Sequence, residues 1–192
     1  NDKLSILSAE APMNSPVLTD GTAFFQLQEE FRAAFQNTVI DMPRNMIIAY
    51  PHLMQDVNVT VIVTELTLAA ARDTIRILAW LKSNAPHCKT IVIGNKMQAA
   101  VLEISRKEFE STIERKLDIA IPADFKATAQ AAKLGRPLVD AVRASKASVG
   151  IFALAELIQG TAAEAAETPV AEAKAKKSML GGFKSLMTKK VM

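Results

Sequence analysis

The sequence contains a single cysteine, few aromatic residues and no long apolar run. Cys88 has no second cysteine with which to form an internal disulfide, which is typical of a protein from a reducing compartment. Aromatic residues make up 5% of the chain, so the core must be built from Ala, Val, Ile, Leu and Met. No apolar run approaches the roughly 18 residues that a membrane-spanning helix needs, and the first ten residues lack the basic start and apolar block of a signal peptide. We therefore expect a cytoplasmic globular protein.

The seven glycines are dispersed, and the usual phosphate-binding loops are missing. Neither Gly-x-Gly-x-x-Gly nor a glycine-rich loop ending in Gly-Lys-Ser/Thr occurs. The Gly-x-Ser-x-Gly motif of hydrolases is missing as well. His52 and His87 do not have the spacing of metal ligands. The sequence therefore predicts no catalytic residue of its own.

Charge is distributed unevenly along the chain. The net charge is +3, but residues 174–192 contain six lysines and no acid, so the preceding body is net negative. A nucleic-acid-binding domain carries its positive charge on the folded surface. We therefore expect no specific nucleic-acid partner.

Strand-like runs of β-branched residues alternate with segments of helical periodicity up to about residue 159. This alternation predicts an α/β domain over residues 1–159, with a mainly parallel sheet and helices on both faces. Strands are predicted at Leu4–Ser8, Val39–Asp41, Val59–Thr64, Ile91–Ile93 and Leu117–Ile121. Helices are predicted from Asp20 or Thr22 to about Phe35 and over Met46–Met54, Leu66–Leu81, Ser105–Lys116, Asp124–Gly135 and Ser145–Gln159.

The longest of these helices has a clear apolar periodicity, which predicts the face that it turns toward the core. Arg72, Asp73 and Arg76 lie off that face. The residues expected to form the buried stripe are Leu68, Ala71, Ile75, Leu78 and Leu81.

Asp41 ends a short β-branched run, and Pro43 prevents that run from continuing as a strand. In an α/β protein this pattern places a carboxylate at the carboxyl end of a buried strand. Ligands bind in the crevice outside such strand ends. Asp41 is therefore the first candidate for a ligand site, with a simple turn residue as the alternative.

Five short motifs follow one another in a recognisable order. They are Val39-Ile40-Asp41-Met42-Pro43-Arg44, Val61–Glu65 followed by Ala71–Thr74, Ile91–Lys96, Ile121–Asp124 and Leu134–Leu138. Together they resemble the C-terminal portion of a MinD/ParA-type P-loop ATPase, with the closest resemblance to the CpaE/TadZ pilus-assembly branch. The resemblance covers roughly Leu4 to Ile158.

The resemblance implies part of a SIMIBI-type P-loop NTPase fold that uses ATP and Mg²⁺. It places Asp41, with Pro43 in the same switch segment, at the water shell of the Mg²⁺ ion. It places Asn95 at the edge of the adenine, names Lys96 as a further nucleotide-binding residue, and places the backbone from Pro122 to Asp124 beside the base. The alternatives are that Asn95 is a turn former and Asp124 a helix cap. The resemblance also implies a homodimer that recruits proteins of a pilus or secretion machinery.

The departures from that family limit the expected activity. The P-loop with its lysines, and the catalytic aspartate after it, would precede Asn1. Arg44 stands where MinD-like proteins have a small Ala-Gly pair. We therefore expect no ATP hydrolysis by this chain alone. The function implied is the assembly and polar localisation of a type IV (Flp/Tad) pilus or secretion system. The alternatives are an inactive localisation scaffold of the same fold and a chromosome- or plasmid-partitioning relative, which the acidic body disfavours.

The end of the chain differs in composition from the rest. Residues 160–177 are rich in Ala, Glu and Lys and predict a flexible linker. Residues 178–192 predict a short basic amphipathic helix that lies on anionic lipid at the inner face of the cytoplasmic membrane. A solvated tail or a partner-docking peptide is the alternative. The expected lipid-facing residues are Met179, Leu180, Phe183, Leu186 and Met187.

Overall fold

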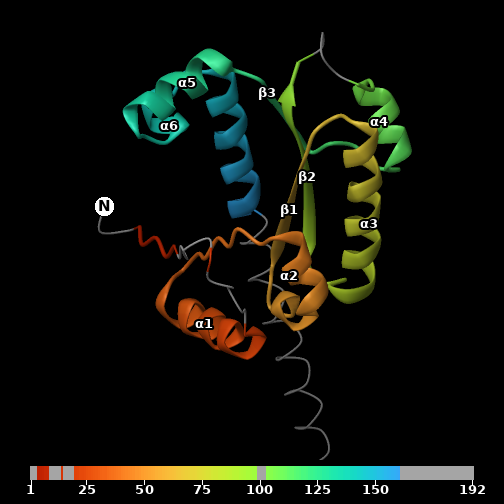
Figure 1. The fold of residues 1–192 in the computed structure, drawn as a ribbon, viewed down its shortest axis with the longest axis vertical. Coiled ribbons are helices and arrows are strands. Elements are labelled where there is room, and N and C mark those ends of the chain that lie inside the picture. The colour runs from red at the N-terminus through yellow and green to blue at the C-terminus, as the bar shows by residue number, and fades with distance from the viewer. Residues whose placement is uncertain (1–3, 9–13, 15–19, 99–102, 161–192) are drawn as a thin grey trace, which may run out of the picture. The chain divides into compact units, whose positions relative to one another are not determined.

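The computed structural model describes residues 4–8, 14, 20–98 and 103–160 of the chain (Figure 1). The chain divides into two compact units, Asn1–Asp56 and Val57–Met192. The predicted membrane tail and all but the first residue of the predicted linker lie outside the described residues. Within the described ranges, no helix combines the length and the apolar character that crossing a membrane requires.

A three-stranded parallel sheet forms the centre of the second unit. Its strands are β1 (Val59–Thr64), β2 (Lys89–Met97) and β3 (Ile119–Pro122), in the order β1-β2-β3. The middle of β2 is the most buried part of the sheet, since Ile91, Val92 and Ile93 are at most 1% exposed. A strand buried on both faces needs a continuous apolar β-branched sequence, which is what β2 has.

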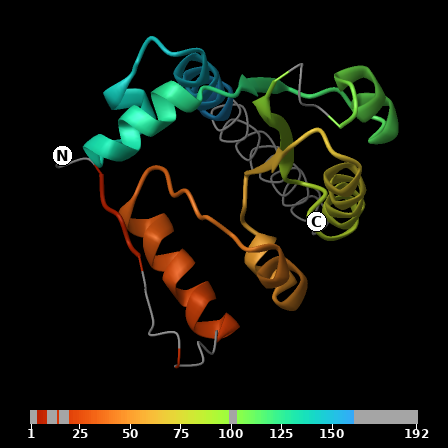
Figure 2. The ribbon, with the colours of Figure 1, turned by 45° about the horizontal axis from the view of Figure 1, so that its top comes forward.

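Helices cover both faces of this sheet (Figure 2). On one side lie α3 (Leu68–Asn84) and α4 (Arg106–Thr112), and on the other lie α5 (Phe125–Leu134), α6 (Leu138–Ala141) and a helix over residues 146–160. The last helix approaches β3 so closely that a Cβ atom at Gly150 would lie 3.0 Å from Ile121 Cγ1. The predicted α/β fold with helices on both faces of a parallel sheet is confirmed.

The ends of these helices follow from local sequence. Thr67 caps α3 by accepting a hydrogen bond from the Ala70 amide at 3.1 Å. Ser105 and Glu108 form the reciprocal capping box of α4, as their spacing predicts. Gly135 ends α5 in the left-handed region at φ 58°, a conformation that glycine adopts without a steric cost.

The buried face of α3 differs from the predicted one. Ala71 and Leu81 are buried as expected, but Leu68 is 61% exposed and Ile75 is 41% exposed. The helix is turned so that Thr74 faces inward at 2% exposure. Thr74 is tolerated there because its hydroxyl finds a hydrogen-bond partner on β1, which periodicity alone does not reveal.

The first unit consists of α1 (Gly21–Ala34), α2 (Arg44–Ala49) and the short 3₁₀ helix η1 (Pro51–Met54). Gln28 of α1 donates a hydrogen bond to the Leu53 carbonyl at 3.3 Å. The start of α1 meets the ring of Tyr50 so closely that a Cβ atom at Gly21 would lie 2.4 Å from Tyr50 Cδ1. Only glycine fits at this approach.

Three predicted elements of the first unit are wrong. Neither Leu4–Ser8 nor Val39–Asp41 is a strand, and Val39 is 91% exposed. A β-strand is stabilised by backbone hydrogen bonds to a neighbouring strand, and no described strand pairs with either segment. The predicted helix Met46–Met54 is split at Tyr50 into α2 and η1. Pro51 causes the break, because the residue before a proline avoids helical geometry.

Candidate functional site

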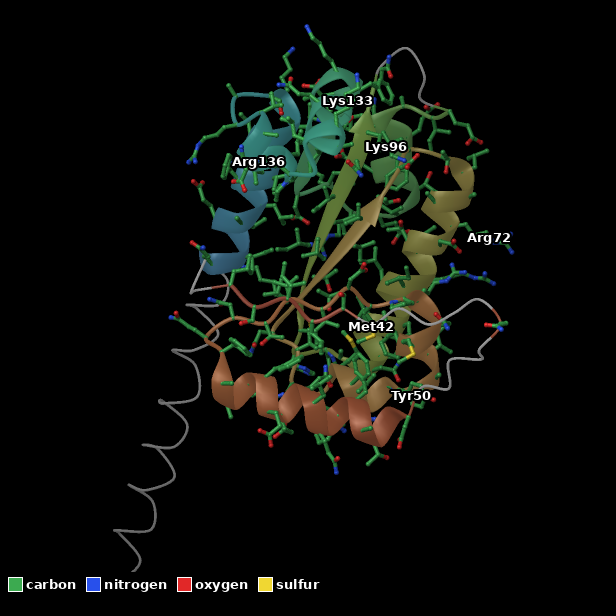
Figure 3. The ribbon with its side chains drawn as sticks, turned by 60° about the vertical axis from the view of Figure 1, so that its left-hand side comes forward. Met42, Tyr50, Arg72, Lys96, Lys133 and Arg136 are labelled. Atoms are coloured by element: carbon green, nitrogen blue, oxygen red, sulfur yellow. The ribbon has the colours of Figure 1, made fainter. Side chains whose placement is uncertain are left out.

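The carboxyl ends of the three parallel strands lie at one edge of the sheet. In open α/β sheets, ligands bind outside that edge. Four residues of the predicted site lie there: Asn95 and Lys96 near the end of β2, Pro122 at the end of β3, and Asp124 two residues later. Figure 3 shows Lys96 at this end of β2. The structure thus brings together two segments that the sequence separates by about 25 residues.

Asn95 and Lys96 are linked by a local hydrogen bond. The Lys96 amide donates to Asn95 Oδ1 at 2.9 Å, and both residues belong to strand β2, so Asn95 does not form a separate turn. The amide nitrogen Nδ2 of Asn95 has no hydrogen-bond partner among the described residues. A primary amide with a free N–H₂ group and a second lone pair on Oδ1 has the donor and acceptor needed for the edge of an adenine.

The segment from Pro122 to Asp124 continues alongside β2. Pro122 is paired with Met97, and the Ala123 amide donates to the Met97 carbonyl at 3.1 Å. Asp124 Oδ1 accepts a hydrogen bond from the Ala127 amide at 2.9 Å and caps α5. The helix-cap interpretation of Asp124 is therefore confirmed, and what remains for a ligand is mainly the backbone of this segment.

Asp41 and Pro43 belong to the first unit and not to the sheet. Asp41 is exposed and follows no strand, while Pro43 immediately precedes α2. The argument that Asp41 ends a buried strand is therefore wrong for this structure. Its role at a Mg²⁺ ion rests on the resemblance alone and stays a prediction.

Clustered metal ligands are not found in the described ranges, where no three His, Cys, Asp or Glu side chains gather around one point. A magnesium ion held by Asp41 through water would need further ligands from the nucleotide.

Burial raises the pKa of the Cys88 thiol, and hydrogen bonds from Thr60 oppose this rise. The thiol is therefore neutral at neutral pH.

Glu65 lies at the same edge of the sheet, and the sequence analysis did not name it as a candidate site residue. It follows β1 directly, and its Oε1 lies 2.7 Å from Lys96 Nζ. The pattern that drew attention to Asp41, an acid after a β-branched run, also describes Glu65.

Helices on both faces of a parallel sheet, with polar groups at its carboxyl edge, define an open α/β domain with a candidate ligand site at that edge. The fold is a partial MinD/ParA-type P-loop NTPase fold. It is similar to the cell division protein MinD of Aquifex aeolicus, with a TM-score of 0.62 and 18% identity. It is also similar to MinD of Pyrococcus furiosus, with a TM-score of 0.60 and 21% identity, and to MinD of Pyrococcus horikoshii in complex with Mg-ADP, with a TM-score of 0.62 and 18% identity.

These similarities concern the fold and cover only part of each molecule. The matches include 76%, 73% and 76% of this chain and 63%, 59% and 59% of the three MinD chains, respectively. The chain thus spans about three fifths of the length of these structures. No protein-family model matches the sequence, and no curated protein matches it.

Proposed function

We propose that this chain is the C-terminal part of a MinD/ParA-like ATPase that acts in the assembly and polar localisation of a type IV (Flp/Tad) pilus or secretion system. The observation that carries the nucleotide part of the proposal is the pairing of Met97 with Pro122, which brings Asn95 and Lys96, just before Met97, to the same edge of a parallel sheet as Pro122–Asp124. The pilus part rests on the order of motifs that resemble the CpaE/TadZ branch.

In this proposal the chain supplies the base-binding side of the nucleotide site. The Asn95 amide hydrogen-bonds the adenine edge, and the backbone from Pro122 to Asp124 flanks the ring. Asp41 holds a water of the Mg²⁺ shell, and the ion would neutralise phosphate charge. The glycine-rich loop that binds phosphates is not encoded in this chain, so the phosphates would be bound by another part of the protein.

Nucleotide binding is tested with the full-length gene product that contains this chain. We expect ATP with Mg²⁺ to bind in isothermal titration calorimetry and to drive dimerisation in sedimentation velocity. Asn95→Ala should weaken ATP binding, and Asp41→Ala should abolish the nucleotide-linked dimerisation. Unchanged dimerisation of Asp41→Ala would remove this residue from its proposed role.

A catalytically inactive localisation scaffold is the second candidate, and the replacement of the family's Ala-Gly pair by Arg44 favours it. If the full-length protein binds no ATP but still localises at the cell pole and supports pilus assembly, the scaffold is correct. If the protein is not found at the cell pole and deletion of its gene does not affect pilus assembly, the localisation function is rejected for both candidates. A partitioning relative would instead retain duplex DNA of random sequence in a salt-sensitive manner.

The proposed membrane contact of the tail needs a separate test. We expect co-sedimentation of the 192-residue chain with vesicles containing anionic lipid, and loss of that binding when residues 178–192 are deleted. Five apolar residues of the tail provide the membrane-facing side, and the nearby lysines interact with lipid headgroups. Replacing Phe183 by Ser should weaken the binding. Equal binding of the intact and truncated chains would reject the membrane proposal.

A further inference from the structure

Strand β2 contains a bulge at the edge where the candidate site lies. Gly94 is paired with Ala120, and the next pair is Met97 with Pro122, so β2 has one residue more than β3 between the two pairs. Within this step Lys96 adopts φ 52°, a left-handed conformation that is unfavourable for a residue with a Cβ atom. Bulges redirect side chains at the ends of strands, often next to functional sites.

Two interactions hold Lys96 in this conformation. Its backbone amide donates to Asn95 Oδ1 at 2.9 Å, and its ammonium group lies 2.7 Å from Glu65 Oε1. Glu65 follows β1, whose last residue pairs with Gly94 just before the bulge. The ion pair therefore joins the neighbouring ends of β1 and β2.

The backbone of Glu65 is itself firmly placed. Its carbonyl accepts hydrogen bonds from the Thr64 hydroxyl at 3.3 Å and from the Thr67 amide at 3.0 Å. The Thr64 hydroxyl in turn accepts from the buried Thr74 hydroxyl of α3 at 3.2 Å. Because both the strand and the helix fix this short link, Glu65 extends from a rigid support toward Lys96.

We propose that Glu65 is a positioning residue of the nucleotide site. Its carboxylate holds Lys96, and the left-handed backbone of Lys96 keeps Asn95 Oδ1 on the Lys96 amide, so that Asn95 Nδ2 stays directed outward to the base. Glu65 itself does not touch the nucleotide. The inference rests on the proposed function, because it assigns a role to Glu65 within that same site.

The ion pair is suited to positioning more than to stabilising the fold. The Lys96 and Glu65 side chains are 63% and 50% exposed, and pairs with such exposure contribute little to the free energy of unfolding. A small effect on stability together with a clear effect on base binding is therefore the expected result of breaking the pair.

ATP binding by the full-length protein tests the inference. Glu65→Gln should weaken the binding of ATP about fivefold at low salt, and leave the binding of inorganic tripolyphosphate, which has no base, unchanged. The charge-reversed double variant Glu65→Lys/Lys96→Glu should recover part of the loss. In an Asn95→Ala background, Glu65→Gln should cause no further loss of ATP binding, because the residue through which Glu65 acts is missing.

Glu114→Gln is a matched control, since Glu114 is also exposed but belongs to no described ion pair.

A measurement without nucleotide separates this inference from the proposed function. In the 192-residue chain, Glu65→Gln should shift the Lys96 backbone amide and both Asn95 Nδ2 proton resonances in an NMR spectrum, whereas Glu114→Gln should shift neither. Unchanged Asn95 resonances would overturn the inference. Equal ATP affinity of Glu65→Gln and the unmodified protein would also overturn it and leave the proposed function standing. If the unmodified protein binds no ATP, the proposed function fails and the role of Glu65 in a nucleotide site fails with it.

Discussion

The hydroxyl of Thr74 donates a hydrogen bond to the hydroxyl of Thr64 across 3.2 Å, and both side chains are buried. This bond joins the inward face of α3 to the carboxyl end of β1. The Thr64 hydroxyl in turn donates a hydrogen bond to the Glu65 carbonyl. A buried polar contact between helix and sheet therefore supports the strand end that carries Glu65.

Removing this bond should destabilise the chain. Thr74→Val keeps the side-chain volume but deprives Thr64 of its donor, so we expect a loss of about 1–2 kcal/mol in urea unfolding. The double variant Thr64→Val/Thr74→Val should cost less than the sum of the two single variants, because no buried hydroxyl is then left without a partner. Thr112→Val, at an exposed position of α4, should change stability by less than about 0.5 kcal/mol. Additive effects of the two core variants would contradict this assignment.

Cys88 should make stability decrease at alkaline pH. Burial raises the pKa of its thiol, so the folded state holds this proton more tightly than the unfolded state. The resulting stabilisation is complete below the unfolded thiol pKa of about 8.5 and is lost as pH rises through the higher folded pKa. Urea unfolding from pH 7 to 10 should show this decrease, and Cys88→Ala should reduce its slope even though the variant is less stable throughout. An identical slope in both proteins would exclude Cys88 as the cause.

The capping box of α4 should contribute a pH-dependent stability of opposite sign. Hydrogen bonds from the side chain and backbone of Ser105 lower the pKa of Glu108. This contribution is present above the unfolded pKa of about 4.3 and is lost as pH falls through the lower folded value. Ser105→Ala should cost about 1 kcal/mol at neutral pH, and Glu108→Gln should reduce the acid dependence by the part that Glu108 contributes. The measurement is thermal unfolding between pH 3 and 7, with Glu103→Gln as a control for carboxylate loss outside the box.

Gly21→Ala should disturb the first unit. The added methyl group would lie 2.4 Å from Tyr50 Cδ1, so the ring or the start of α1 must move. We expect a destabilisation of about 1–3 kcal/mol, as for other overpacked sites. Tyr50 is the only tyrosine, so its ring resonances in an NMR spectrum report the movement directly. Gly160→Ala has open space at its Cβ position and should leave the tyrosine resonances unchanged.

Patterns within one segment predicted the second unit well. The β-branched runs became β1, β2 and β3, the Ser105–Glu108 spacing became a capping box, and Gly135 ended α5. Each of these features depends on interactions within a few residues or on burial of a continuous apolar strand. Such signals are contained in the local sequence.

Predictions that depended on a distant partner were less successful. Val39–Asp41 has the composition of a strand but pairs with no described strand, so it remains irregular and Asp41 is exposed. The predicted buried face of α3 is also partly wrong, because a threonine that finds a buried hydroxyl partner can replace an aliphatic residue in the core. Neither partner can be recognised from the segment alone.

The sequence by itself determined the class of the fold, an α/β domain with a parallel sheet, and the order of polar residues that follow its strands. Only the tertiary structure decided which of those residues meet. The parallel pairing of Met97 with Pro122 brings Asn95 and Lys96 to the edge where Pro122–Asp124 lies, and the Lys96 ammonium group, on a left-handed backbone, lies next to Glu65. The physical reason is that local propensity sets where a strand begins and ends, whereas register and bulges arise from hydrogen bonds to a neighbouring strand far away in the chain.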